Sequence, residues 1–232
     1  MNEILEFETY LSISQTKFGI YLFDTKNKYN LYEKEISFEK TNFINYSQLK
    51  QFLDNNVFRI EKLVGKFIEN IFIIIDDENI LNTQIGIKQK NYQPSKSKVY
   101  LQNSITSAKD LFKENYPDEK IMHIIIKNYL IDGKNYFYLQ DNLEYEQLNL
   151  VVQFKTISNE IIYNLNKLLQ NYQINIIKFL DGNYLKNFFN EDIQISKMAF
   201  DILNGCNVNE VMVVQKKTKK LGFFEKFFQL FS

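Results

Sequence analysis

The sequence predicts an α/β fold, and three observations carry that prediction. The ranges 46–68 and 159–172 place apolar residues at three- and four-residue steps, which is typical of helices with one buried face. The range 71–75 is apolar throughout, which is typical of a strand covered on both sides of a sheet. An Asp-Gly pair at 132–133 separates two apolar runs and indicates a hairpin turn, because glycine tolerates a positive φ angle.

The first unit is expected to hold two strands joined by a turn, then a third strand, a helix and a buried strand. The turn is the polar stretch 14–17, and Ser47 is the candidate N-cap of the helix. In chain order we expect strands over 10–13, 18–23 and 29–38, a helix over 46–68 and a strand over 71–75.

A second unit is expected to follow, in which short strands alternate with two helices. The first of these helices is stopped by Pro117. In chain order we expect strands over 83–88 and 99–101, a helix over 107–115, strands over 121–132, 136–139 and 148–155, a helix over 159–172 and a strand over 174–180. Residues 184–205 are expected to be helical, with Asn204-Gly205 as the stop.

Charge and cysteine content exclude several classes of protein. Acidic and basic residues balance at 28 each, so the chain lacks the cationic field of a general nucleic-acid binder. Cys206 is the only cysteine, so no disulfide within the chain is expected and the thiol should be free. The first ten residues carry acids and no base, unlike a secretory signal, and the longest apolar runs are too short to span a membrane. We therefore expect a cytoplasmic protein that reaches a membrane only by lying on it.

The sequence contains no motif for catalysis or cofactor binding. It has no P-loop, no dinucleotide-binding glycine fingerprint and no zinc-ligand spacing, so we predict no catalytic residue, no cofactor and no metal. His123, the only histidine, lies in an apolar run and is expected to be a packed strand residue. The acidic cluster 76–78 is expected to be a solvated loop, with a cation site as the alternative.

The C-terminal range 216–232 has the pattern of a basic linker followed by an amphipathic helix. On a helical wheel the bulky apolar residues of 221–231 fill one half circle and the polar residues fill the other. The predicted membrane-binding residues are Lys216, Lys217, Lys219, Lys220, Leu221, Phe223, Phe224, Phe227, Phe228, Leu230 and Phe231.

An anionic membrane is the expected partner of this tail. Each lysine near an anionic leaflet contributes ~1 kcal/mol, and full burial of one phenylalanine contributes roughly 1.5–3 kcal/mol. Insertion of the apolar face should therefore dominate binding, while the lysines steer it. Two alternatives stay open, namely a tail packed on the protein itself and a tail held in a partner's groove.

Several segments, taken in order, resemble FtsA, the actin-like family that ties the bacterial cell-division ring to the membrane. They are the opening strand–turn–strand 11–20, His-Ile-Ile at 123–125 with Tyr-Leu-Ile-Asp at 129–132, Asn164 within 159–165, the return strand 177–185, and the basic linker with its amphipathic helix. The resemblance covers most of 8–185 and then 216–232. It implies an incomplete actin-like (ribonuclease H-like) lobe, a small strand–helix–strand inserted subdomain and a C-terminal amphipathic helix.

The chain departs from that family where the family binds ATP. The first phosphate turn of the family has an acid and then a Gly-Thr loop, but here these positions hold Ser12 and Ser14. Only Thr16 and Lys17 are left to touch a phosphate, and a solvated Lys17 is the simpler interpretation. The second phosphate loop and the second lobe of the family have no counterpart in the sequence. We therefore expect a protein that is not an enzyme, with a residual nucleotide-binding ATPase as an alternative.

The resemblance also sets the expected organisation and role. The expected parts are a partial actin-like lobe over 1–78, an inserted subdomain over 79–176, a return strand and helical segment over 177–215 and the membrane-targeting tail over 216–232. The implied role is a non-catalytic adaptor of the cell-division machinery on the cytoplasmic face of the inner membrane, at the division site. An actin-like scaffold of a pilus or secretion apparatus is the alternative.

The expected partners are division-machinery proteins, and self-association is included among the expectations. Binding to the ring protein FtsZ is not implied, because the family's FtsZ site lies in the second lobe. Within the inserted subdomain, the tyrosines of the predicted hairpin are the candidate partner surface, since tyrosine is favoured at protein interfaces. These residues are Tyr129, Tyr136 and Tyr138.

Overall fold

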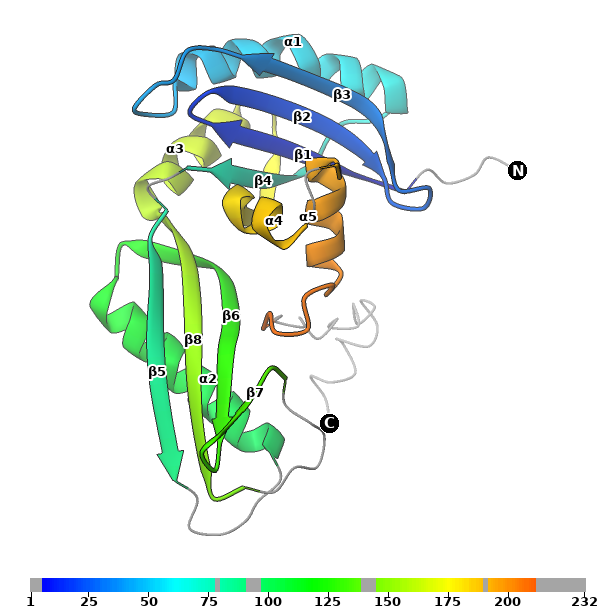
Figure 1. The fold of residues 1–232 in the computed structure, drawn as a ribbon. Helices are drawn as coiled ribbons and strands as arrows, with labels where there is room; N and C mark the ends of the chain where they lie inside the picture. Colours follow the sequence, from blue (N-terminus) through cyan, green and yellow to red (C-terminus); the bar gives the residue numbers. More distant parts are fainter. Residues whose placement is uncertain (1–5, 78–79, 91–96, 139–144, 190–191, 212–232) are drawn as a thin grey trace, which may run out of the picture.

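The computed structural model describes residues 6–77, 80–90, 97–138, 145–189 and 192–211. They form two bodies, each built around its own sheet, one above the other in Figure 1. The upper body, called the lobe below, has a five-stranded sheet in the order β3-β2-β1-β4-β9. The lower body, called the subdomain below, has a four-stranded sheet in the order β5-β8-β6-β7. The mixed α/β architecture with two sheets confirms the predicted α/β fold class.

The lobe sheet combines an antiparallel meander with two parallel strands. Its strands are β1 (Phe7–Ser14), β2 (Lys17–Asp24), β3 (Tyr29–Ser37), β4 (Asn70–Asp76) and β9 (Asn175–Asp181). β1, β2 and β3 are antiparallel neighbours, whereas β4 runs parallel to β1 and β9 runs parallel to β4. The carboxyl ends of three parallel strands therefore meet at one edge of the sheet.

Helices cover both faces of this sheet, which explains the apolar run of β4. On one face lie α1 (Tyr46–Val64) and α3 (Asn159–Gln170), and on the other lie α4 (Gly182–Phe188) and α5 (Ile195–Leu203). Ile73 and Ile75 point into the core beneath α1 and α3, while Ile74 points into the core beneath α4 and α5. A strand buried on both faces needs apolar residues at every position, as the sequence predicts.

The ends of α1 differ from the prediction. Asn45, not Ser47, is the N-cap, and its side chain accepts a hydrogen bond of 3.0 Å from the amide of Gln48. Ser47 already lies in the first turn, because the helix begins at Tyr46. The helix ends at Val64, four residues earlier than predicted, since Gly65 takes a left-handed conformation with φ of 70°.

The subdomain packs one helix on an antiparallel sheet. Its elements are β5 (Asn82–Lys90), α2 (Ser97–Asn115), β6 (Glu119–Ile131), β7 (Lys134–Tyr136) and β8 (Gln147–Ser158). The ring of Phe112 from α2 stacks on that of Phe154 from β8, with 5.0 Å between the centroids. Asp132 and Gly133 have φ angles of 47° and 79°, which confirms the predicted hairpin turn.

The predicted strand over 99–101 is wrong, because these residues lie inside α2. The helix begins at Ser97, ten residues before the predicted start. Leu101, Ile105, Ala108 and Phe112 pack in one cluster at steps of four, three and four residues, so they form a single helical stripe. A three-residue apolar run is too short for its period to separate strand from helix.

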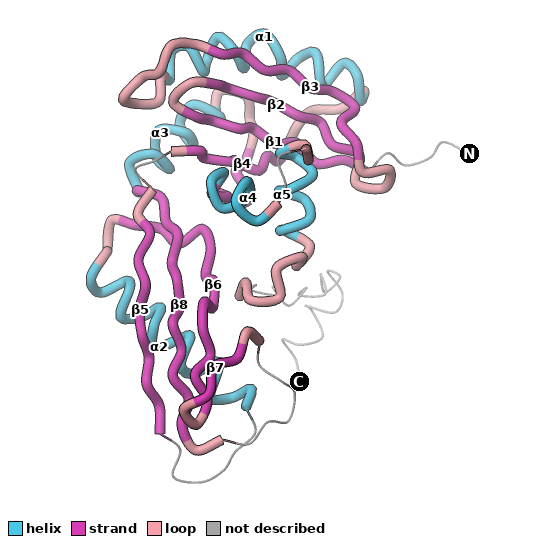
Figure 2. The backbone as a smooth tube through the Cα atoms, in the orientation of Figure 1, coloured by secondary structure: helices cyan, strands magenta, loops and turns pink. Residues whose placement is uncertain are grey.

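The helix α3 packs with the lobe, although the range 79–176 predicted for the inserted subdomain includes it. Its buried residues Leu165, Leu168 and Leu169 belong to the same core as α1 and β4. The chain thus leaves the lobe after β4, builds the subdomain, and returns through α3 and β9. Figure 2 shows this path, with α3 beside the lobe above the ends of β5 and β8.

The predicted helical range 184–205 holds two helices, α4 and α5. Asn204 caps α5 and Gly205 has a φ of 82°, which confirms the predicted stop. The residues 206–211, called the C-terminal strap below, then run to the subdomain. There the amide of Ile126 donates to the carbonyl of Asn209 at 2.9 Å, and the amide of Val211 donates to the carbonyl of Ile124 at 2.8 Å.

Candidate functional site

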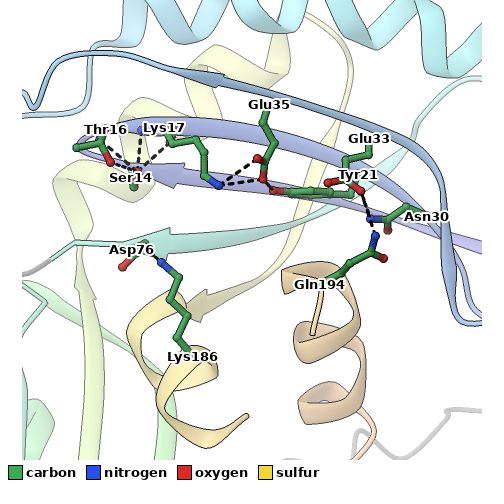
Figure 3. Close-up of polar contacts among 10 residues, drawn as sticks. All are labelled: Ser14, Thr16, Lys17, Tyr21, Asn30, Glu33, Glu35, Asp76, Lys186 and Gln194. Carbon is green, nitrogen blue, oxygen red and sulfur yellow. Dashed lines mark hydrogen bonds and ion pairs between the residues drawn. The ribbon is translucent and has the colours of Figure 1, made fainter. Parts of the chain in front are cut away.

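A cavity of about 460 Å³ lies where β1 and β4 end in the lobe. In open α/β sheets, ligands bind at the carboxyl ends of the strands, so this corner is the first place to look for a site. Ser14 at the end of β1 lies opposite Asp76 at the end of β4. Lys186 of α4 and Gln194 before α5 complete one side of this corner cavity. Figure 3 shows the polar side chains around it.

The turn between β1 and β2 is hydrogen-bonded to itself. The Ser14 hydroxyl oxygen accepts from the amide of Thr16 at 3.2 Å and from that of Lys17 at 2.8 Å. The same hydroxyl donates to the carbonyl of Lys17 at 3.0 Å. Successive turn amides form an anion site only when they point outward at the anion. Here both amides already have a partner, which is the hydroxyl of Ser14.

Both lysines that line the corner cavity are paired with carboxylates. The Lys17 ammonium lies 3.1 Å from each carboxylate oxygen of Glu35, and Lys186 pairs with Asp76. These side chains are partly exposed, and such ion pairs contribute only about 0–1 kcal/mol each. These two ion pairs are therefore too weak, by themselves, to prevent a multiply charged anion from taking the place of Glu35 and Asp76 beside the lysines.

The overall charge of the corner cavity is a stronger obstacle to a phosphate. Three carboxylates line it, those of Glu33, Glu35 and Asp76, against the two lysines. Glu33 accepts hydrogen bonds from Asn30 at 2.9 Å and from Gln194 at 3.3 Å. A triphosphate that displaced both ion pairs would face the carboxylates, and like charges at close range repel.

Tyr21 and Glu35 form a hydrogen-bonded pair on the wall of the corner cavity. Burial and the hydrogen bond to Glu35 raise the pKa of Tyr21, so the phenol keeps its proton. Burial alone would raise the pKa of Glu35, but hydrogen bonds from Tyr21 and Lys17 outweigh it and lower that pKa below its ordinary value. The Glu35 carboxylate is therefore charged, and its hydrogen bonds with Tyr21 and Lys17 hold its orientation.

The polar groups that β1 and β4 contribute to the corner cavity are the hydroxyls of Ser12 and Ser14 and the carboxylate of Asp76. Ser12, at the family's acid position, offers a hydroxyl where a carboxylate would organise Mg²⁺ and water. Among the described residues, no group of three histidine, cysteine or acidic side chains is arranged to hold a metal ion. The acid Asp76 at the end of β4 is paired with a lysine.

A second polar cluster lies at the joint between lobe and subdomain, and it is buried. The Nε2 atom of His123 on β6 accepts a hydrogen bond of 3.0 Å from the amide of Asp181, so His123 is neutral with its proton on Nδ1. That Nδ1–H donates to Glu210 of the strap at 2.7 Å, and the hydroxyl of Tyr184 on α4 donates to the other oxygen of Glu210 at 2.9 Å. Asp181 also pairs with Lys155 of β8. Five segments thus meet in this cluster, called the node below, namely β6, β8, β9, α4 and the strap.

The predicted membrane-binding residues Lys216 to Phe231 lie outside the described residues. Among the helices that the structure describes, none combines the length and apolar character that crossing a bilayer requires. The tail therefore stays a prediction from the sequence, and the structure contributes its starting point. That point is Val211, fixed to β6 beside Ile124.

The predicted tyrosine surface is wrong for Tyr129. This residue is only 4% exposed and packs in the subdomain core with Ile126 and Ile131. The cause is a β-bulge between Ile126 and Asn128, which shifts the alternation by one residue and turns Tyr129 inward. Tyr136 is half-buried at the edge of the same core, and Tyr138 is 60% exposed.

Other single-residue predictions have mixed outcomes. His123 is buried in β6 as predicted, and Cys206 is a free, exposed cysteine. The loop predicted at 76–78 begins one residue later, because Asp76 is the last residue of β4, and Asp77 is a partly exposed loop residue. Asp76 pairs with Lys186, and the Asp77 carboxylate accepts from the Gln15 side chain at 3.1 Å. Asp76 ends the buried strand β4 beside the end of β1, and Asp77 follows it. Acidic residues directly after an apolar run were the sequence signal for a polar site at this corner.

Sequence reasoning missed Glu35 as the partner of Lys17, Lys186 as the partner of Asp76, and the strap. Glu35 on β3 is 18 residues from Lys17, and Lys186 on α4 is 110 residues from Asp76, so no local motif links either pair. Glu210 lies 87 residues from His123. In each case only the pairing of distant strands brings the side chains together.

The comparisons with known proteins found similar structures only. No protein-family model and no curated protein matches the chain. The structure is similar to the cytoplasmic domain of EpsL, an inner membrane component of the type II secretion system of Vibrio cholerae, at 7% identity with a TM-score of 0.37, over 78% of this chain and 57% of that one.

Two further solved structures are similar over a comparable share of the chain. One is the PilM-PilN type IV pilus biogenesis complex, at 10% identity with a TM-score of 0.43, over 78% of this chain and 49% of that one. The other is a protein from Bacteroides thetaiotaomicron with an actin-like ATPase fold and unknown function, at 16% identity with a TM-score of 0.36, over 79% and 56%. The chain spans about half the length of the three chains it matches.

Proposed function

We propose that this protein is a non-catalytic adaptor that holds a protein assembly on the inner face of a bacterial membrane. The lobe and subdomain are the protein-binding part, and the tail over 216–232 is the membrane anchor. The chain has no nucleotide reaction to perform in this account. Its role is to connect a partner to the membrane.

The self-bonded turn of Ser14 is the observation that carries the proposal. An actin-like ATPase needs outward turn amides and a carboxylate at the strand end, and this chain has Ser14 and Ser12 at those positions. The excess of carboxylates in the corner cavity supports the same conclusion. The amphipathic pattern of the tail supports the anchor.

The resemblance to FtsA makes cell division the first candidate for the assembly. A scaffold of a pilus or secretion apparatus is the second, and EpsL and the PilM-PilN complex belong to assemblies of that kind. The two candidates share the membrane anchor and differ in location. A fluorescent fusion should form a band at mid-cell for a division adaptor, whereas a pilus or secretion scaffold should follow the position of that apparatus.

Isothermal titration with ATP and Mg²⁺ tests the non-catalytic part of the proposal. We expect no binding heat at millimolar nucleotide, because the turn amides are occupied and the cavity is acidic. A saturable isotherm would contradict the proposal and favour the residual nucleotide-binding ATPase. Lys17→Ala would then show whether the heat comes from the corner cavity, since it removes a cation from that site alone.

A further inference from the structure

A groove of about 580 Å³ lies between the lobe and the subdomain, away from the corner cavity's walls. The segment before α1, the N-terminal half of α3, the segment before β5, the start of β6 and the end of β8 line it. We call it the inter-body groove. Both bodies contribute apolar residues to its lining, and these include Phe43, Ile44, Ile75, Ile80, Leu81, Ile157 and Ile161.

The inter-body groove exposes more apolar surface than a finished core would. Phe43, one of its lining residues, is 83% exposed, although full burial of a phenylalanine side chain contributes roughly 1.5–3 kcal/mol. A hydrophobic surface rimmed by polar groups is typical of a binding site for a protein segment. The volume lies in the range of small binding pockets, so the groove takes a few bulky side chains and not a whole domain.

The charges around the inter-body groove have one sign. Asp77, Glu119 and Glu160 line it, and none of the described lining residues is a lysine or an arginine. The Thr156 hydroxyl donates to Glu119 at 2.7 Å, which keeps one carboxylate oriented at the rim. The groove therefore favours a segment that is apolar on one face and basic at its start.

The chain itself contains a segment of this chemistry. Residues 216–220 include four lysines, and residues 221–231 present phenylalanine and leucine on one face. We propose that the tail over 216–232 docks in the inter-body groove of its own chain when no membrane is present. This inference rests on the proposed function, because it gives the membrane anchor a second, protein-bound position.

The register of the subdomain sheet puts the groove within reach of the tail. The strap ends at Val211 beside Ile124 of β6, and Ile124 lies opposite Phe154 of β8. Thr156, which lines the groove, lies two residues beyond Phe154 along β8, a distance of about 7 Å. Across the sheet, the strap and β8 are separated by two strand spacings, or about 10 Å. The nine residues 212–220 can span about 30 Å, so they connect Val211 to the groove with slack.

Docking in the groove and lying on a membrane use the same apolar face. The tail cannot do both, so vesicles should compete with the groove. The groove accepts only part of the aromatic face, whereas a membrane accepts all of it. An anionic membrane should therefore win the competition, and the docked tail should keep the aromatic face covered until a membrane is reached.

Cross-linking between engineered cysteines tests the docked position. The full chain would carry Cys206→Ser to remove the native thiol, Gln229→Cys on the polar face of the tail and Asn42→Cys at the groove. The matched control replaces Asn42→Cys by Asn70→Cys, which is also exposed but lies at the far end of β4, about 20 Å from Asp76. A short bifunctional maleimide joins the pair, and denaturing gels report the product.

We expect the Asn42 variant to give at least a fivefold higher yield of intramolecular product than the Asn70 variant. Glu160→Lys should lower that yield severalfold, and vesicles of phosphatidylcholine and phosphatidylglycerol should lower it as well. Equal yields from Asn42 and Asn70 would overturn the inference, and so would a product that forms only between chains, because the occupant would then be a second copy.

Flotation of the same samples separates this inference from the proposed function. A chain that floats with vesicles but gives no selective cross-link would retain the anchor and overturn the docked tail. A chain that cross-links selectively but never floats would retain the docked tail and overturn the membrane anchor.

Discussion

Replacing Glu210 by alanine should loosen the joint between the two bodies. The side chains of Glu210 and His123 are 3% and 0% exposed, and Glu210 accepts hydrogen bonds from His123 and Tyr184. Glu210→Ala leaves both of these donors without a partner. Each unsatisfied buried polar group costs about 1–3 kcal/mol, so the sum is ~2–6 kcal/mol.

Two effects offset part of this cost: the variant no longer buries a charged carboxylate, and water can enter the space and hydrogen-bond to the two donors. We therefore expect Glu210→Ala to lower the free energy of unfolding by about 2–4 kcal/mol. For a chain of this size each kcal/mol lowers Tm by about 2–4 °C, so Tm should fall by roughly 4–16 °C. Urea unfolding followed by circular dichroism gives the free energy, and calorimetry gives Tm.

Two variants control this measurement. Glu210→Gln keeps an oxygen acceptor for one of the two donors, so it should cost about half as much as Glu210→Ala. Lys50→Met removes an exposed ion pair with Asp54 on α1 and should change the free energy of unfolding by less than ~0.5 kcal/mol. If Glu210→Ala changes stability no more than Lys50→Met, the strap does not hold the joint and this account of the node is wrong.

Two further predictions concern the corner cavity and the subdomain surface. The folded pKa of Glu35 lies below its ordinary value of 4.5, so its contribution to stability is complete above that value and is lost as the pH falls through the lower folded pKa. Lys17→Met should reduce this acid-side loss in a pH series of urea unfolding, and an unchanged pH profile would show that Lys17 does not hold the carboxylate. The pair Phe137→Ala and Tyr138→Ala removes two exposed side chains and should change the free energy of unfolding by less than ~0.5 kcal/mol. The same variant should still float with vesicles but fail to concentrate at the site of assembly in cells, and normal localisation would exclude this hairpin as the partner surface.

The architecture could be predicted from the sequence where one local pattern determined it. The run 71–75 indicated a strand covered on both faces, and the Asp132-Gly133 turn indicated its hairpin. The prediction for the N-terminal part of α2 was wrong, because the short run 99–101 fits the period of a strand as well as that of a helix. The prediction that Tyr129 is exposed was wrong for another reason. A β-bulge changes the face of the sheet on which the following residues lie, and no sequence pattern indicated it.

The sites were less predictable than the fold. The resemblance predicts Ser12 and Ser14 at the positions of a phosphate turn, and the structure shows that the Ser14 hydroxyl accepts hydrogen bonds from the turn amides of Thr16 and Lys17. The partners Glu35, Lys186 and Glu210 come from distant parts of the chain, and only the sheet pairings bring them to Lys17, Asp76 and His123. The sequence shows which side chains can form ion pairs or hydrogen bonds, but only the tertiary fold determines which of them are close enough to do so.

Flotation with anionic vesicles, with and without ATP and Mg²⁺, tests the central claim most directly. The account predicts that the full chain floats equally well in both conditions, because the tail inserts and the corner cavity binds no nucleotide. Phe227→Glu should reduce binding about tenfold or more, since it loses roughly 1.5–3 kcal/mol of apolar burial and adds a charge to the inserted face. A chain that stays at the bottom of the gradient, or that floats only when ATP is present, would contradict the account of a nucleotide-independent membrane adaptor.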